Sequence, residues 1–428
     1  MKTPKYHLYC TKCGAEIDNF GTWFSQGQKC NCGCSRAEVK YFTDYSRLKD
    51  LCSNENLSEG LFRYFDLLPL NDINDAVTLG EGTVPLERWQ FLEDLAKDKY
   101  GIDCKVVVTR SDLSGGTGTF KDPAGALAAS LFKEYGIKEF CVASTGNTAT
   151  AFSRYLSLIG TKCTVFSPSD VNPDTVEAVR SYGQTMNVSE GNYACAKKEC
   201  ADFSANHGVL TSAGNIDPIR VESKRTLVFE YLRQLGGMPD VYIQAVAGGT
   251  APIALDKGVR ELNDTQVKSV FDCDQLCGGK EVKLPRMVLV QQDLCDPMVQ
   301  AWEKAVASGF PTGWENDYPS IAQPATKISI LSTGTPGMYP IVAPIVRKSG
   351  GSFVRVKEDS LVELAREVFD HKNFVPGPAS MVCIAGFIQA LNQGLIHSGE
   401  TVSVNMGEGS GRASAFRHKV LDVSENGK

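Results

Sequence analysis

The chain has 428 residues, 42% of them hydrophobic, and a formal net charge of −6. This length supports a large buried core divided over two or three domains. The acidic balance without a basic stripe argues against nucleic-acid binding. The first residues are polar and no run of about 18 apolar residues occurs, so we expect neither a signal peptide nor a membrane span, and hence a cytoplasmic protein.

Five of the 15 cysteines lie near the amino terminus: Cys10, Cys13, Cys30, Cys32 and Cys34. Thiolates from two tight turns can converge on a tetrahedral zinc ion, so we expect a zinc-ribbon-like segment over residues 1–40. The second turn offers three cysteines where a ribbon needs two. We favour Cys10, Cys13 and Cys30 with one of the other two; the alternative is a degenerate ribbon without metal. The ten remaining cysteines fall mostly in apolar runs and are predicted to be free thiols.

A polar helical connector is predicted over residues 41–68, and the next informative residue is Lys121. It follows a β-type run at 106–109 and a glycine-rich turn, and a helical apolar stretch begins at Ala124. A lysine at a strand-to-helix junction is partly desolvated, which lowers its pKa and frees the amine as a nucleophile. A Schiff base to an aldehyde cofactor needs such an amine. The alternative is an ordinary solvated lysine.

Three further turns follow β-type runs, at residues 143–149, 246–252 and 402–411. Each is rich in glycine or in small polar side chains. Such residues at a helix start serve either as a helix cap or as a cradle for an anion. Because the carboxyl ends of parallel strands meet at one edge of an open α/β sheet, we expect these turns and Lys121 to surround one ligand.

From residue 106 onward, β-type runs alternate with helical ones, which predicts parallel sheets covered on both faces. The strands are too many for one small sheet, so two sheets are expected. Further β-type runs lie at 140–142, 163–166, 209–211, 241–243, 288–290, 353–356 and 402–404, and helical runs at 175–182, 194–206 and 361–369. The polar segment 256–284 is predicted to be a surface insertion.

Four motifs occur in a fixed order: Gly80-Glu81-Gly82-Thr83-Val84-Pro85-Leu86, Thr117-Gly118-Thr119-Phe120-Lys121-Asp122, Ser144-Thr145-Gly146-Asn147-Thr148 and Ala247-Gly248-Gly249-Thr250. Together they resemble the threonine synthase family, which uses pyridoxal phosphate and has fold type II, the tryptophan-synthase-β-like fold. The match spans about residues 61–411. The resemblance implies an α/β protein with a large cofactor-binding domain (41–122 and 238–428), a small mobile domain (123–237) and, usually, a homodimer.

The resemblance also implies roles for residues around the cofactor. Lys121 would form the Schiff base and then move protons at the Cα and Cβ atoms of the substrate. Asn147 would donate a hydrogen bond to the phenolic oxygen of the cofactor. The turn formed by Ala247, Gly248, Gly249, Thr250 and Ala251 would bind the cofactor phosphate at a helix N-terminus.

A second anion site is implied for the phosphate of the substrate, an amino-acid phosphate. Asn215 and Arg220 match the segment that holds it, with help from Ser144 and Thr148. Arginine suits phosphate because its planar fork binds two oxygens at once. Thr83 and the turn 144–148, including Thr145, would position the substrate carboxylate. The alternative is that Arg220 only pairs with Asp217 or Glu222 on a surface helix.

Several positions depart from the family pattern. Met406 stands where a serine or threonine normally faces the pyridine nitrogen of the cofactor, and methionine cannot donate a proton. Glu408 or Ser410 are the candidates to replace it. Gly377 stands where a glutamate is expected, and Pro123, Gly115-Gly116 and Val84 also differ. We therefore expect an altered substrate pocket beside preserved cofactor turns.

The favoured function is a pyridoxal-phosphate lyase acting on a phosphorylated amino acid, with threonine synthase activity as the leading reaction: phosphohomoserine and water give threonine and phosphate. One alternative is β-replacement on O-phosphoserine, as in cysteate synthase, and another is a threonine or serine dehydratase. The alternative from a different class is a binding or regulatory protein on an inactive enzyme scaffold. Retention of Lys121, Asn147 and the Gly248-Gly249 turn argues against that.

Overall fold

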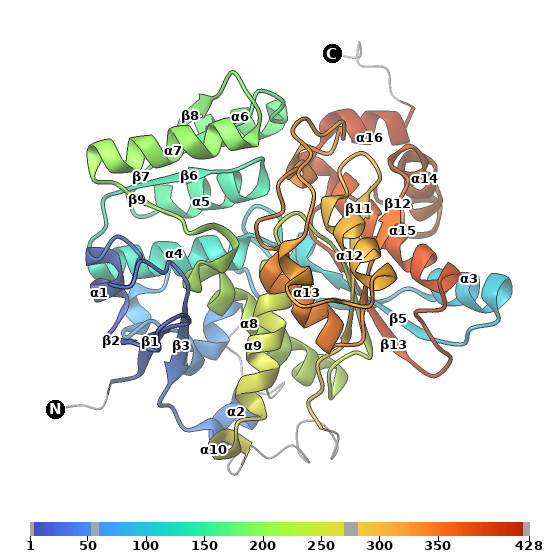
Figure 1. The fold of residues 1–428 in the computed structure, drawn as a ribbon, viewed down its shortest axis with the longest axis horizontal. Coiled ribbons are helices and arrows are strands. Elements are labelled where there is room, and N and C mark those ends of the chain that lie inside the picture. The colour runs from blue at the N-terminus through green and yellow to red at the C-terminus, as the bar shows by residue number, and fades with distance from the viewer. Residues whose placement is uncertain (1–3, 53–59, 269–280, 423–428) are drawn as a thin grey trace.

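The computed structural model describes residues 4–52, 60–268 and 281–422 of the chain. These residues form a three-stranded, a four-stranded and a six-stranded sheet. Figure 1 shows the four-stranded sheet above the N-terminal three-stranded one, with the six-stranded sheet beside both. The expected α/β fold with parallel and mixed sheets is confirmed.

The N-terminal sheet is antiparallel and has the order β2-β1-β3. Its elements are β1 (Tyr6–Cys10), β2 (Glu16–Ile17), helix α1 (Phe20–Ser25) and β3 (Ala37–Tyr41). Alternate residues of β1 are buried, as expected for a strand with one covered face. On α1, Phe24 lies with its ring centroid 5.5 Å from that of Phe132 on α4 (Asp122–Tyr135), so the segment packs against the rest of the protein.

The six-stranded sheet has the order β12-β11-β10-β13-β5-β4, and β4 is its antiparallel edge strand. Its strands are β4 (Leu86–Arg88), β5 (Lys105–Arg110), β10 (Val241–Ala245), β11 (Arg286–Gln292), β12 (Ser352–Val356) and β13 (Thr401–Met406). The helices of this region are α3 (Gln90–Tyr100), α9 (Thr250–Leu262), α12 (Pro297–Ala307), α13 (Tyr339–Lys348), α14 (Leu361–Lys372), α15 (Pro378–Asn392) and α16 (Ser414–Val420). Central strands are continuous apolar runs because helices cover both faces.

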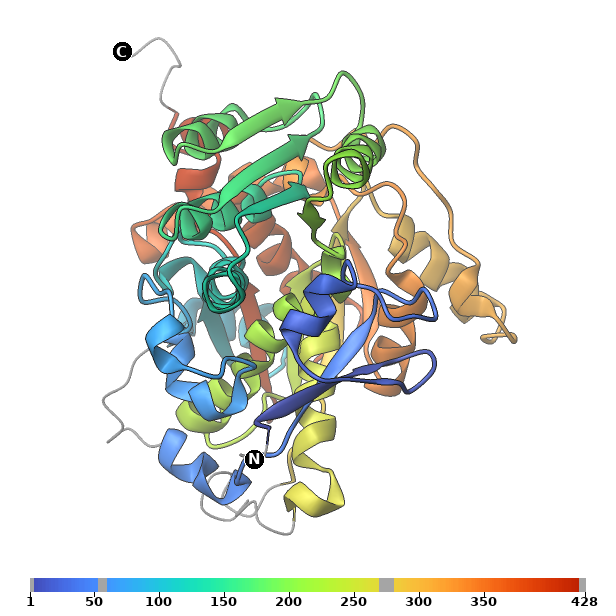
Figure 2. The same cartoon turned by 90° about the vertical axis from the view of Figure 1, so that its left-hand side faces the viewer.

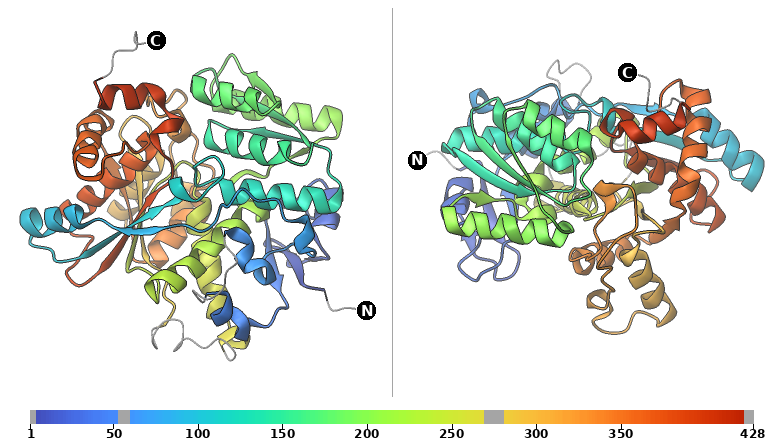
Figure 3. Two further views of the ribbon diagram at one scale, coloured as in Figure 1. Left: turned by 180° about the vertical axis from the view of Figure 1, so that it is seen from behind. Right: turned by 90° about the horizontal axis from the view of Figure 1, so that it is seen from above.

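The four-stranded sheet is entirely parallel, in the order β8-β7-β6-β9. Its elements are β6 (Glu139–Ala143), α5 (Asn147–Ser157), β7 (Lys162–Ser167), α6 (Pro173–Ser181), β8 (Thr185–Val188), α7 (Tyr193–His207) and β9 (Leu210–Thr211). Helix α5 packs on β7 from one face, and α7 packs on β6 and β7 from the other. Seen from above in Figure 3, this sheet with its helices (cyan to green) lies beside the C-terminal helices (red).

Helix α8 (Pro218–Leu235) connects these parts, because a buried ionic cluster joins it to α9 and to the end of β3. The Arg225 guanidinium contacts the carboxylates of Glu222 and Glu261 at 3.0 and 2.9 Å. Lys257 approaches Glu222 at 2.9 Å, and the Tyr41 hydroxyl donates to the same carboxylate. Figure 2 shows the N-terminal sheet (blue) against the yellow helix α9. The N-terminal sheet is thus attached to the helix that begins at the candidate site.

The prediction of a surface insertion at residues 256–284 is wrong for its first part. Residues 256–262 are the second half of helix α9, and Asp256, Lys257 and Val259 are buried there. The charges are paired inside the protein, so polarity in the sequence did not mean exposure. A short helix, α10 (Thr265–Lys268), follows, and residues 269–280 lie outside the described part of the chain.

The predicted helical connector at residues 41–68 contains only short helical segments where it is described. These are the turn Tyr45–Arg47, helix α2 (Leu48–Leu51) and the 3₁₀ segment Leu61–Leu67. No helix within the described ranges is both long enough and apolar enough to cross a membrane.

Candidate active site

A cavity of about 370 Å³ opens where the four-stranded and six-stranded sheets meet. Its walls come from the turns after β6, β10 and β13, from the residues that precede α4 and from the start of α8. Most of the predicted site residues line it: Lys121, Ser144, Thr145, Asn147, Thr148, Asn215, Arg220, Ala247, Gly248, Gly249, Thr250, Ala251 and Glu408. The structure therefore brings together turns that are up to 287 residues apart, from position 121 to position 408.

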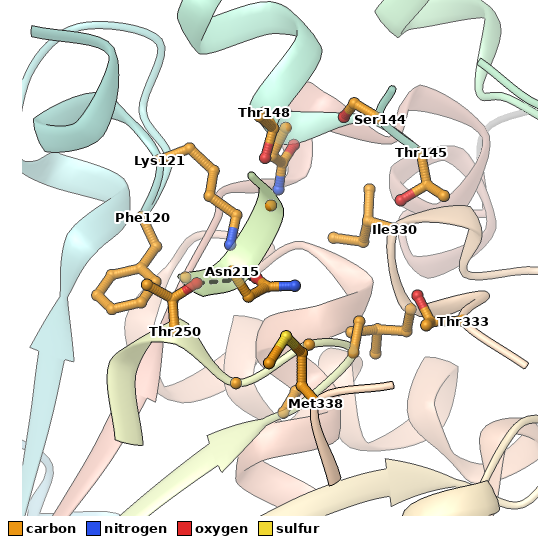
Figure 4. Close-up of a pocket in the computed structure, with 18 of the residues that line it drawn as sticks. Phe120, Lys121, Ser144, Thr145, Thr148, Asn215, Thr250, Ile330, Thr333 and Met338 are labelled. Atoms are coloured by element: carbon orange, nitrogen blue, oxygen red, sulfur yellow. Dashed lines mark hydrogen bonds between the residues drawn. The ribbon is translucent and has the colours of Figure 1, made fainter. Parts of the chain in front are cut away.

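Lys121 is the residue immediately before helix α4, and its side chain extends into the cavity, with the amine toward Asn215 and Thr250 (Figure 4). The turn before it is held by the buried carboxylate of Asp122. That carboxylate accepts hydrogen bonds from the backbone N–H groups of Thr117 and Thr119, at 2.9 and 2.7 Å. The preceding turn is therefore fixed at the base of the cavity, and the lysine is presented from a rigid helix start.

Burial lowers the pKa of Lys121 to about 8, the positive charge of Arg220 adds to this effect, and the carboxylate of Glu408 opposes it. A second lysine lies close by. Lys224 on α8 is buried, donates a hydrogen bond to the backbone carbonyl of Phe120, and has its amine 4.0 Å from the Phe120 ring centroid. Burial, followed by the charges of Lys121 and Arg220, also lowers its pKa. The pattern of the sequence held no signal for Lys224.

The turn before α9 has the geometry of a phosphate cradle. A Cβ atom at Gly248 would lie 1.9 Å from the side-chain amide nitrogen of Asn215, which would have to move, and Gly249 has a φ of +93°, which favours glycine. No acceptor within the described residues takes a hydrogen bond from the N–H groups of Gly248 or Gly249. The Thr250 hydroxyl donates to Asn215 at 2.8 Å. Unpaired N–H groups at the N-terminus of a 13-residue helix suit a phosphate. These donors therefore fit the phosphate group of pyridoxal phosphate.

Asn147 and Glu408 meet across the cavity. The Asn147 side-chain amide donates to the Glu408 carboxylate at 2.6 Å, and the other carboxylate oxygen accepts from the N–H of Ala379 at 3.2 Å. Burial raises the pKa of Glu408, against the hydrogen bonds from Asn147 and Ala379. Met406 is only 1% exposed and packs in the hydrophobic core instead of lining the cavity.

Arg220 lies in the first turn of α8 and is buried, so the alternative of a surface ion pair is not what the structure shows. The Asp217 carboxylate accepts from Ser212 and from the N–H of Ile219, and the Glu222 carboxylate faces Arg225 and Lys257. The Arg220 Nε atom is buried and finds no hydrogen-bond partner among the described residues. A buried guanidinium without a bound carboxylate is a site for an anionic ligand.

Two predicted residues, Thr83 and Ser410, lie outside the cavity lining, and a third, Ser144, has an additional role. The hydroxyl of Thr83 accepts from the N–H of Gly60 at 2.7 Å, and neither Thr83 nor Ser410 is among the residues that line the cavity. Ser144 does line it, but its hydroxyl oxygen accepts from the N–H groups of Gly146 and Ala149, so it also caps helix α5. The roles of Thr83 and Ser410 stay predictions.

The amino-terminal cysteines form a compact cluster away from this cavity. The sulfur atoms of Cys10, Cys13, Cys30 and Cys32 all lie within 4.8 Å of one another, with 3.5 Å between Cys10 and Cys32. A Zn–S bond of about 2.3 Å in a tetrahedron requires sulfurs about 3.8 Å apart, so the cluster fits zinc. Cys34 is outside it, and its sulfur accepts from the N–H of Arg36 at 3.4 Å. The structure thus selects Cys32 over Cys34.

Comparison with known proteins agrees with this geometry. Residues 77–407 match the family described as pyridoxal-phosphate dependent enzyme. The chain is 28% identical over 398 residues to a threonine synthase of Methanocaldococcus jannaschii, covering 92% of this chain and 89% of that protein. It is 26% identical over 402 residues to a threonine synthase of Methanosarcina acetivorans, covering 93% of this chain and 90% of that protein.

Solved structures show the same fold at lower identity. Threonine deaminase isoform 2 of Solanum lycopersicum superposes with a TM-score of 0.58 at 18% identity, over 86% of this chain and 96% of that one. Diaminopropionate ammonia lyase of Escherichia coli superposes with a TM-score of 0.62 at 14% identity, over 89% of this chain and 92% of that one. The chain therefore belongs to the pyridoxal-phosphate dependent enzyme family, with fold type II. Within that family it is similar to the two threonine synthases named above.

Proposed function

We propose that this enzyme releases phosphate from a phosphorylated amino acid, and that its reaction is that of threonine synthase, in which phosphohomoserine and water give threonine and phosphate. One observation carries the proposal: Arg220, buried and without a bound carboxylate, lies in the same cavity as Lys121 but apart from the Gly248–Thr250 turn. The cavity thus offers one anion site for the cofactor and a second for the substrate.

The described residues suit each part of the cofactor. Lys121 would hold its aldehyde carbon, Asn147 its phenolic oxygen, and the N–H groups of Gly248, Gly249 and the first turn of α9 its phosphate. When bound, the cofactor supplies an electron sink for negative charge at the substrate Cα, which no side chain provides.

Lys121 is the group that moves protons. Its lowered pKa leaves more of the amine neutral near pH 7 than in a free lysine, and only the neutral amine can accept a proton from Cα. Lys121 would also accept a proton from Cβ as the Cγ–O bond breaks and phosphate leaves. It would return the two protons to Cγ and Cα, while water adds its hydroxyl at Cβ and its proton goes to the released phosphate. Its place at a helix start keeps it within the cavity throughout.

Glu408 is the residue that we assign to the pyridine nitrogen, in place of the buried Met406. Since burial raises its pKa, the carboxyl group keeps a proton more readily than a solvated glutamate, and it can share that proton with a ring nitrogen. Asn147 orients the carboxylate through its hydrogen bond. Ser410 remains the second candidate for this position.

Arg220 would bind the substrate phosphate, with Thr148 beside it, and the Ser144–Thr148 turn at the start of α5 would face the substrate carboxylate. The N-terminus of this 11-residue helix carries a partial positive charge that favours an anion. Asn215 lies between these groups and the cofactor turn, since it accepts from Thr250.

Substrate profiling of the purified, cofactor-loaded enzyme tests the proposal. Phosphohomoserine should release one phosphate and one threonine per turnover. Release from O-phosphoserine, and a sulfonate product when sulfite is added, would favour β-replacement instead. A 2-oxo acid and ammonia from unphosphorylated threonine or serine would favour a dehydratase. A protein without a visible cofactor band, before or after Lys121→Ala, would be a binding module and would end the proposal.

Three further expectations stand as proposals beside this one. The four-cysteine cluster would hold a structural zinc ion, because its thiols match the ion in number and spacing. Residues 1–40, 41–122 with 238–428, and 123–237 would act as separate domains, the last one mobile. The enzyme would work as a cytoplasmic homodimer.

A further inference from the structure

Helix α7 brings two side chains to the cavity that the sequence motifs do not include, Tyr193 and Lys197. They are four residues apart, so they lie one above the other on the same face of the helix. The Tyr193 hydroxyl donates to the backbone carbonyl of Ala143 at 3.3 Å. The Lys197 amine lies 4.9 Å from the centroid of the Tyr193 ring, so the ring supports the lysine side chain.

Arg220 lines the same cavity as Tyr193 and Lys197. Its guanidinium lies 5.2 Å from the centroid of the Phe152 ring on α5. Burial raises the pKa of the Tyr193 hydroxyl, and the charge of Arg220 acts against this rise. Two cations, one from α7 and one from α8, therefore lie at the part of the cavity formed by α5, α7 and α8.

These two cations share a feature that sets them apart from their neighbours. Within the described ranges, neither Lys197 nor Arg220 forms a salt bridge or donates a side-chain hydrogen bond. The next residue, Lys198, is exposed and pairs with Asp202 at 2.7 Å. Lys197 is also exposed as a residue, yet partial desolvation of its amine lowers its pKa. The charge of Asp217 acts on Arg220 but forms no ion pair with it. A bound dianion would supply the direct anionic partner that both cations lack.

We propose that Lys197 determines specificity for a phosphorylated substrate, by binding the distal phosphate together with Arg220 while Tyr193 positions it. This inference rests on the proposed function and adds a second cation to the phosphate site. The division of labour follows from chemistry: arginine grips two oxygens in a fixed plane, and lysine adds a mobile point charge to the third. A phosphate carries close to two negative charges at neutral pH, so two cations neutralise it.

The test uses the cofactor-loaded enzyme and two neighbouring variants, Lys197→Met and the matched control Lys198→Met. Calorimetry measures the binding of inorganic phosphate and of unphosphorylated L-threonine, and kinetics measure KM and kcat for the phosphorylated substrate. We expect Lys197→Met to weaken phosphate binding and raise KM by about tenfold, with L-threonine binding and kcat unchanged. Lys197→Arg should restore most of the affinity, and Lys198→Met should match the wild type.

The outcomes separate this inference from the proposed function. If Lys197→Met binds phosphate as well as wild type while the wild type still releases phosphate from substrate, the inference is wrong and the proposed function stands. An equal loss for phosphate and L-threonine would assign Lys197 to the carboxylate, which also overturns the inference. If the wild type neither binds phosphate nor acts on any phosphorylated amino acid, both fail. A thermal unfolding curve for each variant identifies a merely structural effect.

Discussion

The carboxylate of Glu408 occupies the space that a side chain at Gly377 would need. A Cβ atom built at Gly377 would lie 2.6 Å from Cγ and 2.9 Å from Cδ of Glu408. The backbones are also joined, since the N–H of Gly377 donates to the carbonyl of Glu408. The absence of a side chain at Gly377, one of the departures from the family pattern, therefore makes room for the carboxylate of Glu408.

Gly377→Ala should disturb the site through this contact alone, because the φ of −71° at this position is open to alanine. The added methyl group would displace the Glu408 carboxylate from Asn147 and Ala379. We expect a loss of about 1–3 kcal/mol in the free energy of unfolding, measured in urea, and a weaker visible cofactor band. Gly237→Ala is the control, since a Cβ there meets nothing within 4 Å. If both variants change the free energy of unfolding and the cofactor band equally, the contact between residue 377 and Glu408 does not explain the effect.

The reactivity of Lys121 should depend on pH with a midpoint of about 8, the pKa that burial and Arg220 together give it. The amine reacts with an aldehyde only when neutral, so borohydride trapping of pyridoxal phosphate at this residue should rise with pH through that value. Because Arg220 lowers this pKa and Glu408 raises it, Arg220→Gln should move the midpoint up and Glu408→Gln should move it down. Mass spectrometry of the tagged peptide provides the measurement. Shifts in the same direction would refute the electrostatic assignment.

The same lysine links pH to the stability of the cofactor-free protein. Its folded-state pKa lies below the value of the unfolded chain, so the unfolded chain binds more protons between about pH 8 and pH 10. The contribution of Lys121 to the free energy of unfolding should therefore increase as the pH rises through that window. Lys121→Met should remove this increase in urea titrations, whereas Lys133→Met, on the exposed side of α4, should leave it in place.

Arg220→Ala should act on the phosphorylated substrate and little on an unphosphorylated ligand. The buried guanidinium has no carboxylate bound to it, so its removal deletes a ligand contact without breaking an ion pair. The charge of Arg220 also lowers the pKa of the buried Asp217, so that pKa should rise in the variant. We expect KM for phosphohomoserine to rise by an amount equivalent to about 2 kcal/mol or more. An unchanged KM would remove Arg220 from the substrate site.

The cysteine cluster makes a prediction that distinguishes two residues only two positions apart. Purified protein should contain one zinc ion per chain. Cys32→Ser should lose the metal, because its sulfur lies within the four-thiol group, and Cys34→Ser should keep it, because its sulfur accepts from the Arg36 N–H instead. Elemental analysis of both variants checks this. Loss of zinc in Cys34→Ser with retention in Cys32→Ser would reverse the assignment.

Much of the fold could be predicted from the sequence, because strands and helices follow from local periodicity. The apolar runs at 106–109 and 241–243 became β5 and β10, and the turns behind them became walls of the cavity. The glycines at 248 and 249 could likewise be interpreted locally as a tight turn before a helix, and the φ of +93° at Gly249 agrees with that. These features depend on residues that are neighbours in the chain.

The sequence by itself determined the strand-to-helix junction of Lys121, the order of the glycine-rich and polar turns and the two cysteine-bearing turns. Only the tertiary structure decided that Cys32 joins the cluster, that Lys224 contacts Phe120, that Lys197 lines the cavity, and that Glu408 fills the space at Gly377. The physical reason is the distance along the chain over which each kind of interaction acts. A backbone conformation is set by nearby residues, whereas the partner of a side chain is set by which helices and strands pack together, often across hundreds of residues.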